Sequence, residues 1–279
     1  MINLEQQLKI RIESGAIELP MLPAVGVQVL ALTQNEDSDA SGLASLIEND
    51  LSLTSYILKV SNSAAFSSYG KTQTLQQAIT KLGMKNIAQL ALTMTVGQGV
   101  FKSDALTHEI TSYLWQHSLF SALWAREIAG LCRLNADVVF LNALLHQIGK
   151  PVVLHAISDL LNGPAQLPEF DDLLGLIEKY QKRMGLKLAH SWNLPESITA
   201  TISYIDEYEL ANDMQLEVAA VNAARLLADI VLATGEPVQF EDAVADQAVF
   251  GELSLAKVEI QLLDKKRDAV GQMMQALII

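Results

Sequence analysis

Two of the five histidines stand in sequence contexts that favour a metal site. All five lie between positions 108 and 190, which concentrates the imidazoles in the middle of the chain. His117 follows Trp115 in a helical pattern, and His146 ends an apolar run immediately before Gln147. The spacing of the two histidines suits facing positions on consecutive antiparallel helices, where imidazoles can ligate one ion.

Helices must position these residues, because no segment alternates as a strand does. The clearest is signalled by Thr74-Leu-Gln-Gln77, a capping box, and by Gly83, which stands where a helix ends. Asp50 is placed to cap an earlier helix. Further helices are predicted at 86–101, 111–132, 136–147, 171–192, 195–208, 215–233 and 254–277, with a surface loop at 162–168. The expected fold is all-α.

Composition and charge exclude several classes of function. Half of the 279 residues are hydrophobic and the formal net charge is −13, so the chain predicts a packed globular protein that does not bind nucleic acid. Its single cysteine, Cys132, cannot form a disulfide within the chain. The segment Met1–Gly15 lacks the apolar core of a signal peptide, and no apolar stretch reaches the roughly 18 residues of a membrane span. These features predict a cytoplasmic protein with no membrane partner.

Several spaced motifs resemble those of one family, the HDOD domain, over about residues 17–230. They follow in the family's order along the chain: Leu19–Pro23, Asn49–Thr54, Val60–Ala64, Ala78–Gly83, Trp115–Ser118, Leu144–Lys150 and Trp192–Pro195. The resemblance implies an N-terminal helical bundle (1–104) packed on an HD-like helical bundle (105–235). Residues 236–279 are expected to be a C-terminal helical extension that packs on this module.

The resemblance also implies which residues of a metal site the two histidines match. In the related HD phosphohydrolases, an earlier His, an adjacent His-Asp pair and a later Asp hold a divalent metal. His117 and His146 match the two histidines, whereas Gln147 stands in place of the pair's Asp and offers no anionic oxygen. The later Asp is left open between the positions of Arg225 and Asp229.

The resemblance implies a bacterial signalling module that acts by protein or ligand binding, with other signalling proteins as its partners, and the substitution implies that it is not an enzyme. We expect no catalytic residue, no metal and no cofactor. A vestigial pocket is expected from His117, His146, Gln147, Lys150 and Gln181, and a polar cluster facing a partner from Ser61, Asn62 and Ser63. Two alternatives stay open: a metal-dependent phosphohydrolase with a non-standard site, and a sensor that binds a nucleotide or small anion through Lys150.

Simpler structural roles compete with these functional ones. His117 and His146 are equally expected as helix histidines with satisfied hydrogen bonds. Lys150, which precedes a proline, is expected near a helix C-terminus, where its charge is favoured. Asn62 and Ser63 are typical of a turn or a cap.

Overall fold

The chain is helical throughout the part that the structure describes. The structure is a computed structural model that describes residues 4–34, 40–102, 104, 107–161, 169–233 and 238–278. No β-strand occurs in these ranges, which confirms the predicted all-α fold. The predicted loop at 162–168 lies outside them.

The first half of the chain contributes a compact group of helices. These are α2 (Ala24–Gln34), α3 (Ala40–Glu48), α4 (Leu51–Ser61), the 3₁₀ helix η1 (Ala64–Tyr69), α5 (Leu75–Leu82) and α6 (Met84–Val100). The Asp50 carboxylate accepts a hydrogen bond from the Leu53 amide, and Thr74 and Gln77 form the predicted capping box. Both start signals are therefore confirmed. Gly83 ends α5 at φ 83°, a conformation that few residues other than glycine adopt readily.

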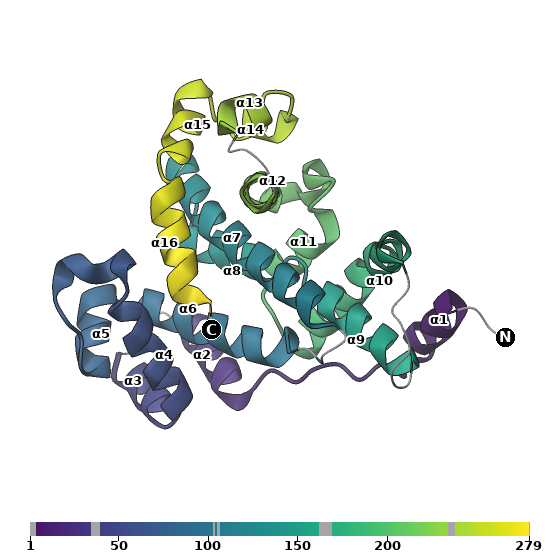
Figure 1. Cartoon of the computed structure of the whole chain (residues 1–279), viewed down its shortest axis with the longest axis horizontal. Coiled ribbons are helices and arrows are strands. Elements are labelled where there is room, and N and C mark those ends of the chain that lie inside the picture. Colours follow the sequence, from purple (N-terminus) through teal and green to yellow (C-terminus); the bar gives the residue numbers. More distant parts are fainter. Residues whose placement is uncertain are drawn as a thin grey trace.

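The second bundle surrounds one long helix. Its elements are α7 (His108–Cys132), α8 (Ala136–Leu145), α9 (Gly149–Leu161), α10 (Phe170–Ser191), α11 (Glu196–Tyr204), the 3₁₀ helix η2 (Tyr208–Met214) and α12 (Gln215–Leu232). α7 packs against both α8 and α12, and α9 packs against α10 (Figure 1). The histidine-bearing elements are thereby brought to the centre of this bundle.

The helix α9 was not anticipated from the sequence, because Pro151 looked like a helix breaker. Proline lacks an amide hydrogen, but the first turn of a helix has no intrahelical acceptor for that hydrogen. Pro151 occupies this first turn, since α9 begins at Gly149. Lys150 therefore lies near the start of a helix, and its expected place near a helix C-terminus was wrong.

The last part of the chain forms four helices: α13 (Phe240–Ala243), α14 (Ala248–Glu252), α15 (Lys257–Asp264) and α16 (Arg267–Leu277). The single helix predicted at 254–277 is therefore wrong, because the chain turns at Lys265 and Lys266. α16 packs against α7 and also against η1, so it joins the two groups of helices (Figure 1). The buried Tyr56 hydroxyl donates to the carbonyl oxygen of Leu277, at 3.2 Å, where α16 ends.

The helix α1 (Leu4–Ser14) lies away from α2 to α5 (Figure 1). It packs against α9, and Glu5 forms an ion pair of 2.6 Å with Lys179 on α10. The division into 1–104, 105–235 and 236–279 stays a prediction. The contacts of α1 place this helix with the second bundle.

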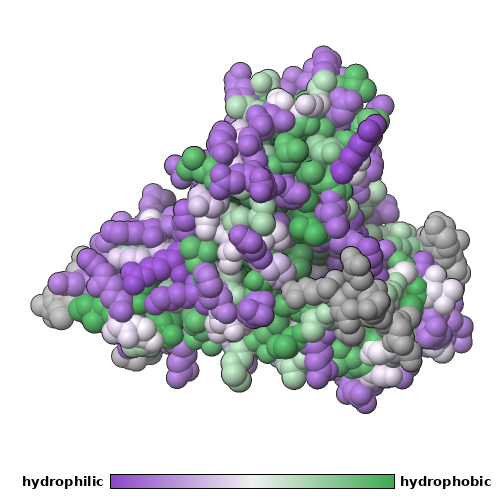
Figure 2. Space-filling model, turned by 180° about the vertical axis from the view of Figure 1, so that it is seen from behind, coloured by the Kyte–Doolittle hydropathy of each residue, from purple (hydrophilic) through white to green (hydrophobic). Residues whose placement is uncertain are grey.

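The surface is mixed in polarity. On the face drawn in Figure 2, hydrophilic side chains occur over all parts of the molecule, with hydrophobic ones between them. Among the described residues, one stretch, Ala136–Leu161, is long and apolar enough to be compared with a membrane span. That stretch comprises α8, a turn and α9, and 78% of its most apolar window is buried inside the protein, as in core helices.

Candidate functional site

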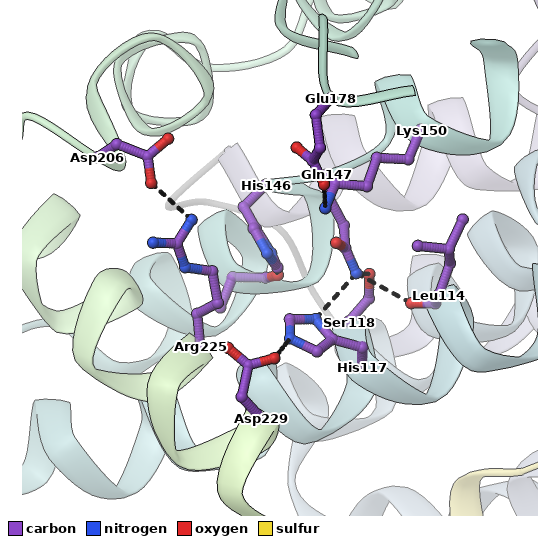
Figure 3. Close-up of polar contacts among 11 residues, drawn as sticks. Leu114, His117, Ser118, His146, Gln147, Lys150, Glu178, Asp206, Arg225 and Asp229 are labelled. Atoms are coloured by element: carbon purple, nitrogen blue, oxygen red, sulfur yellow. Dashed lines mark hydrogen bonds and ion pairs between the residues drawn. The ribbon is translucent and has the colours of Figure 1, made fainter. Parts of the chain in front are cut away.

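The two histidines and Gln147 come together where α7, α12 and the turn after α8 meet (Figure 3). His117 lies in the middle of α7, whereas His146 and Gln147 form the turn that leads into α9. All three side chains are buried. The two imidazole centroids are 5.8 Å apart, so the predicted grouping of these residues is what the fold produces.

The amide of Gln147 is held by three groups on α7. Its Nε2 lies 3.0 Å from the carbonyl oxygen of Leu114, 3.0 Å from Nδ1 of His117 and 3.1 Å from Oγ of Ser118 (Figure 3). A carbonyl oxygen can only accept, so the contact with Leu114 requires the NH₂ end of the amide to point towards α7. The backbone carbonyl of Leu114 therefore determines the orientation of the Gln147 side-chain amide.

That orientation also determines the proton on His117. Because the amide NH₂ of Gln147 donates, Nδ1 of His117 must accept and carries no hydrogen. Nε2 then carries the ring proton and donates it to Oδ1 of Asp229, at 2.9 Å. Both ring nitrogens of His117 are thus engaged, one as an acceptor and one as a donor.

Arg225 and Asp229, between which the sequence left the later HD aspartate open, have different partners. Asp229 lies on α12 and reaches His117, whereas Arg225, one turn earlier on α12, forms an ion pair of 2.7 Å with Asp206. Of the two positions, Asp229 brings a carboxylate to His117. Its side chain is 53% exposed, so the His117–Asp229 contact lies at the open edge of the site.

His146 is arranged differently from His117. Its Nδ1 lies 2.6 Å from the carbonyl oxygen of Ala143 and must donate to it, which leaves Nε2 as a bare lone pair. No hydrogen-bond partner reaches Nε2 among the described residues, although this atom is buried. Burial lowers the pKa of His146 well below its ordinary value, and the charges of Arg225 and Lys150 act in the same direction.

Two ion pairs stand beside His146. Lys150 at the start of α9 contacts Glu178 on α10, at 2.6 Å, and Arg225 contacts Asp206 (Figure 3). The two cations are mostly buried, with 19% and 27% of their side chains exposed, whereas the carboxylates of Glu178 and Asp206 are 55% and 67% exposed. The positive groups therefore face inwards and the negative groups face water.

Gln181, the fifth predicted member of the pocket, plays a different part. Its carbonyl oxygen is where α10 touches α9, because a Cβ added to Gly149 would lie 1.9 Å from it. Within the described ranges, no hydrogen bond joins the Gln181 side chain to either histidine. The close approach of α9 and α10 at Gly149 instead determines the position of Lys150 at the start of α9.

The predicted partner-facing cluster divides between interior and surface. Ser61 is fully buried and donates to the carbonyl oxygen of Leu58, so it cannot face a partner. Asn62 caps α4, and its side chain binds both the amide and the carbonyl of Thr72, each at 2.7 Å. Ser63 is half-buried and lines an open groove of about 580 Å³ between η1 and α16.

The sequence did not indicate the partners that hold this site together. Leu114 acts through its backbone carbonyl, and Ser118 and Glu178 act through side chains whose direction depends on the packing of α7 and α10. Asp229 was one of the two residues that the sequence left open. The helical periodicity of α7 could have indicated Ser118 and Leu114, which are close to His117 on one turn.

A divalent metal does not fit the donor groups as they stand. An amide NH₂ has no lone pair for a cation, and the two ring nitrogens of His117 already serve Gln147 and Asp229. Consistent with this, the described residues contain no group of three or more His, Cys, Asp or Glu side chains placed to hold a metal ion.

Comparisons with known proteins agree on one fold. A crystal structure from Shewanella amazonensis SB2B, of a protein provisionally named a metal-dependent phosphohydrolase, superposes with a TM-score of 0.75 at 21% identity and covers 100% of both chains. An HDOD domain protein of unknown function from Geobacter sulfurreducens gives a TM-score of 0.74 at 22% identity, over 97% of this chain and 96% of that chain.

Sequence comparison gives a curated relative and a family. An uncharacterised protein of Treponema pallidum (strain Nichols) is 24% identical over 194 residues, which are 67% of this chain and 37% of that protein. The chain thus spans little more than a third of that relative's length. The HDOD domain profile matches residues 19–208, well over half of the chain. The chain therefore belongs to the HDOD domain family, a signalling-associated family related to the HD phosphohydrolases.

Proposed function

We propose that this chain is a non-enzymatic signalling module that acts by binding other proteins. The observation that carries the proposal is the position of the Gln147 amide. It stands where related HD phosphohydrolases have a metal-binding aspartate, and it donates to the ring of His117. This residue is therefore part of a hydrogen-bond network that holds α7 against the turn after α8.

Conversion of this network into a metal site would require several coupled changes. His117 would have to move its ring proton from Nε2 to Nδ1, and Gln147 would have to rotate its amide to accept that proton. Rotation would place the amide oxygen about 3 Å from the carbonyl oxygen of Leu114, where two acceptors repel each other. The buried network therefore opposes metal binding more strongly than the loss of one charge would.

The groove between η1 and α16 is where we place partner binding. Ser63 of the predicted polar cluster lines the groove, although its hydroxyl oxygen is buried, and Lys59, Gln272 and Gln275 line it too. Gln272 and Gln275 are exposed, and such side chains can exchange water for a partner's hydrogen-bonding groups. The conformation of the groove depends on α16, which contacts both bundles.

The proposal is tested by metal content and hydrolysis measured on one preparation. The purified protein is incubated with manganese, iron or zinc, desalted, analysed by elemental mass spectrometry and assayed on a panel of phosphodiesters and nucleotides. We expect metal well below one equivalent and no turnover. Stoichiometric metal together with hydrolysis, both lost in a His117→Ala, His146→Ala double variant, would overturn the proposal.

A second variant shows whether the network is what prevents metal binding. Gln147→Asp replaces the amide with the carboxylate that the HD pattern has at this position, and we expect it to raise the metal content above that of the natural chain. Gln98→Asp, which places a carboxylate on an exposed position of α6, is the matched control and should leave the metal content unchanged.

A further inference from the structure

The Nε2 atom of His146 is one of seven buried side-chain nitrogen or oxygen atoms that have no hydrogen-bond partner among the described residues. His146 is only 4% exposed, and its Nδ1 is committed to the carbonyl oxygen of Ala143. Its bare Nε2 has no donor in the described structure, and a buried polar atom without a partner is unfavourable. The atom is therefore an unsatisfied acceptor, to which a ligand with a hydroxyl group could donate a hydrogen bond.

Two cations stand on either side of this atom. Figure 3 shows the His146 ring between the guanidinium of Arg225 and the ammonium of Lys150. Both charges are close enough to disfavour protonation of the ring and so contribute to the lowered pKa of His146. The ring, Arg225 and Lys150, which we call the His146 cluster, thus combine one acceptor with two fixed positive charges.

We propose that the His146 cluster binds hydrogenphosphate without a metal ion. The inference rests on the proposed function, because it requires that no divalent metal occupies the site. One protonated oxygen of the ligand would donate to Nε2 of His146. The anionic oxygens would accept from Arg225, whose planar guanidinium suits paired oxygens, and from Lys150.

The carboxylates now paired with these cations can be exchanged for another anion. Asp206 and Glu178 are 67% and 55% exposed, so water can solvate both carboxylates once they leave the cations. A bound oxyanion would take their place on Arg225 and Lys150, and both carboxylates would turn to water. The ligand would thereby also meet the unsatisfied Nε2, which neither carboxylate does.

The hydroxyl donor makes the inference specific. At neutral pH, inorganic phosphate carries a proton on one oxygen, whereas sulfate has none and can only accept. Because Nε2 of His146 is itself an acceptor, sulfate would place two acceptors against each other. We therefore expect the cluster to prefer phosphate to sulfate by at least about tenfold.

The test is isothermal titration calorimetry of the full chain with inorganic phosphate and with sulfate, at equal ionic strength and with a chelator present. We expect phosphate binding that falls at least tenfold in Arg225→Gln and in Lys150→Gln. Arg133→Gln and Lys265→Gln remove exposed cations elsewhere and should leave the affinity unchanged. No phosphate binding, equal sulfate binding, or equal losses in the control variants would overturn the inference.

A gain of affinity provides a test that misfolding cannot imitate. Asp206→Asn and Glu178→Gln remove the carboxylates that compete for the two cations, so the double variant should bind phosphate several-fold more tightly. Weaker or unchanged binding in this double variant would contradict the exchange. Failure of phosphate binding leaves the proposed signalling function intact, whereas metal-dependent hydrolysis would overturn that function by a different measurement.

Discussion

The amide nitrogen of Gln147 lies 3.0 Å from Nδ1 of His117, and this contact assigns the protons of the site. It makes Nδ1 an acceptor and leaves the ring proton on Nε2, which donates to Asp229. His146 has the opposite arrangement, with its proton on Nδ1. Two histidines at positions that resemble a metal site therefore carry different tautomers, each determined by a different neighbour.

Removal of the Gln147 amide should destabilise the fold. In Gln147→Leu, a carbonyl oxygen, a hydroxyl and a ring nitrogen on α7 lose contact with the two N–H donors that they share in a buried place. We expect the free energy of unfolding, measured by urea denaturation, to fall by about 2–4 kcal/mol. The control is Gln98→Leu at an exposed position of α6, expected within about 0.5 kcal/mol of the natural chain. Equal effects of the two variants would contradict the network.

Capping residues in the sequence correctly predicted the starts of the helices that carry them. The capping box at Thr74 and the cap at Asp50 are both present, because such pairs of side chain and backbone lie within one turn of chain. Where the signal was ambiguous, prediction failed. Pro151 is as compatible with a first helical turn as with a helix end, and only the packing of α9 on α10 decides between them.

The C-terminal region shows how a shifted periodicity misplaces a buried face. An unbroken helix over 254–277 would bury Val258 and Leu262, yet these side chains are 62% and 43% exposed. Within α15 the buried side chains are instead Ile260 and Leu263, and after the turn at Lys265 the new helix α16 buries Val270 and Met274. A change of phase depends on what the helices pack against, which the sequence alone does not specify.

The sequence predicted which residues group in the candidate site, but it did not predict the hydrogen bonds between them. His117, His146 and Gln147 could be grouped from their spacing and from the resemblance to HD proteins. Whether Arg225 or Asp229 reaches His117 depends on the position of α12 along its axis, since the two lie one turn apart on nearly the same face. Likewise, the identity of the hydrogen-bond donor to His117 depends on the orientation of the Gln147 side-chain amide, which the sequence does not specify.

Gly149 should not tolerate a side chain. A Cβ there would lie 1.9 Å from the carbonyl oxygen of Gln181 and 2.6 Å from the amide nitrogen of Gly185, both backbone atoms that cannot rotate away. We expect Gly149→Ala to lower the unfolding free energy by more than about 3 kcal/mol and to displace the start of α9.

Gly175→Ala on α10 is the matched control, because a Cβ at that position meets nothing within 4 Å. Alanine there should be neutral or stabilise by up to about 1 kcal/mol, as in an open helix position. Similar melting temperatures for Gly149→Ala and the natural chain would show that α9 and α10 do not approach as closely as described.

Stability should fall as the pH is lowered towards 5, in part because of His146. Its pKa is lowered, first by burial, so the folded chain leaves the ring neutral where the unfolded chain protonates it, below about pH 6.5. The unfolded state then binds more protons, and the unfolding free energy decreases by up to about 1.4 kcal/mol per pH unit for this group. His146→Asn should reduce the slope between pH 6 and pH 5. Parallel slopes for both proteins would contradict the assignment.

The helix α16 should belong to the same cooperative unit as the two bundles. Met274 is 1% exposed, so Met274→Ala is expected to lower the unfolding free energy by about 2–5 kcal/mol in a single transition. The neighbouring Gln275 is exposed, and Gln275→Ala should change the value by less than about 0.5 kcal/mol. An early separate transition confined to Met274→Ala would instead show that α16 folds independently.

The most direct test of the account is a measurement of the ring nitrogens of His117 and His146 by ¹⁵N nuclear magnetic resonance, without and with zinc. Protonated and bare nitrogens have well separated shifts, so the tautomers can be assigned. The account predicts a proton on Nε2 of His117 and on Nδ1 of His146, both unchanged by one equivalent of zinc. A bare Nε2 on His117, or a stoichiometric shift of both rings on addition of zinc, would contradict it.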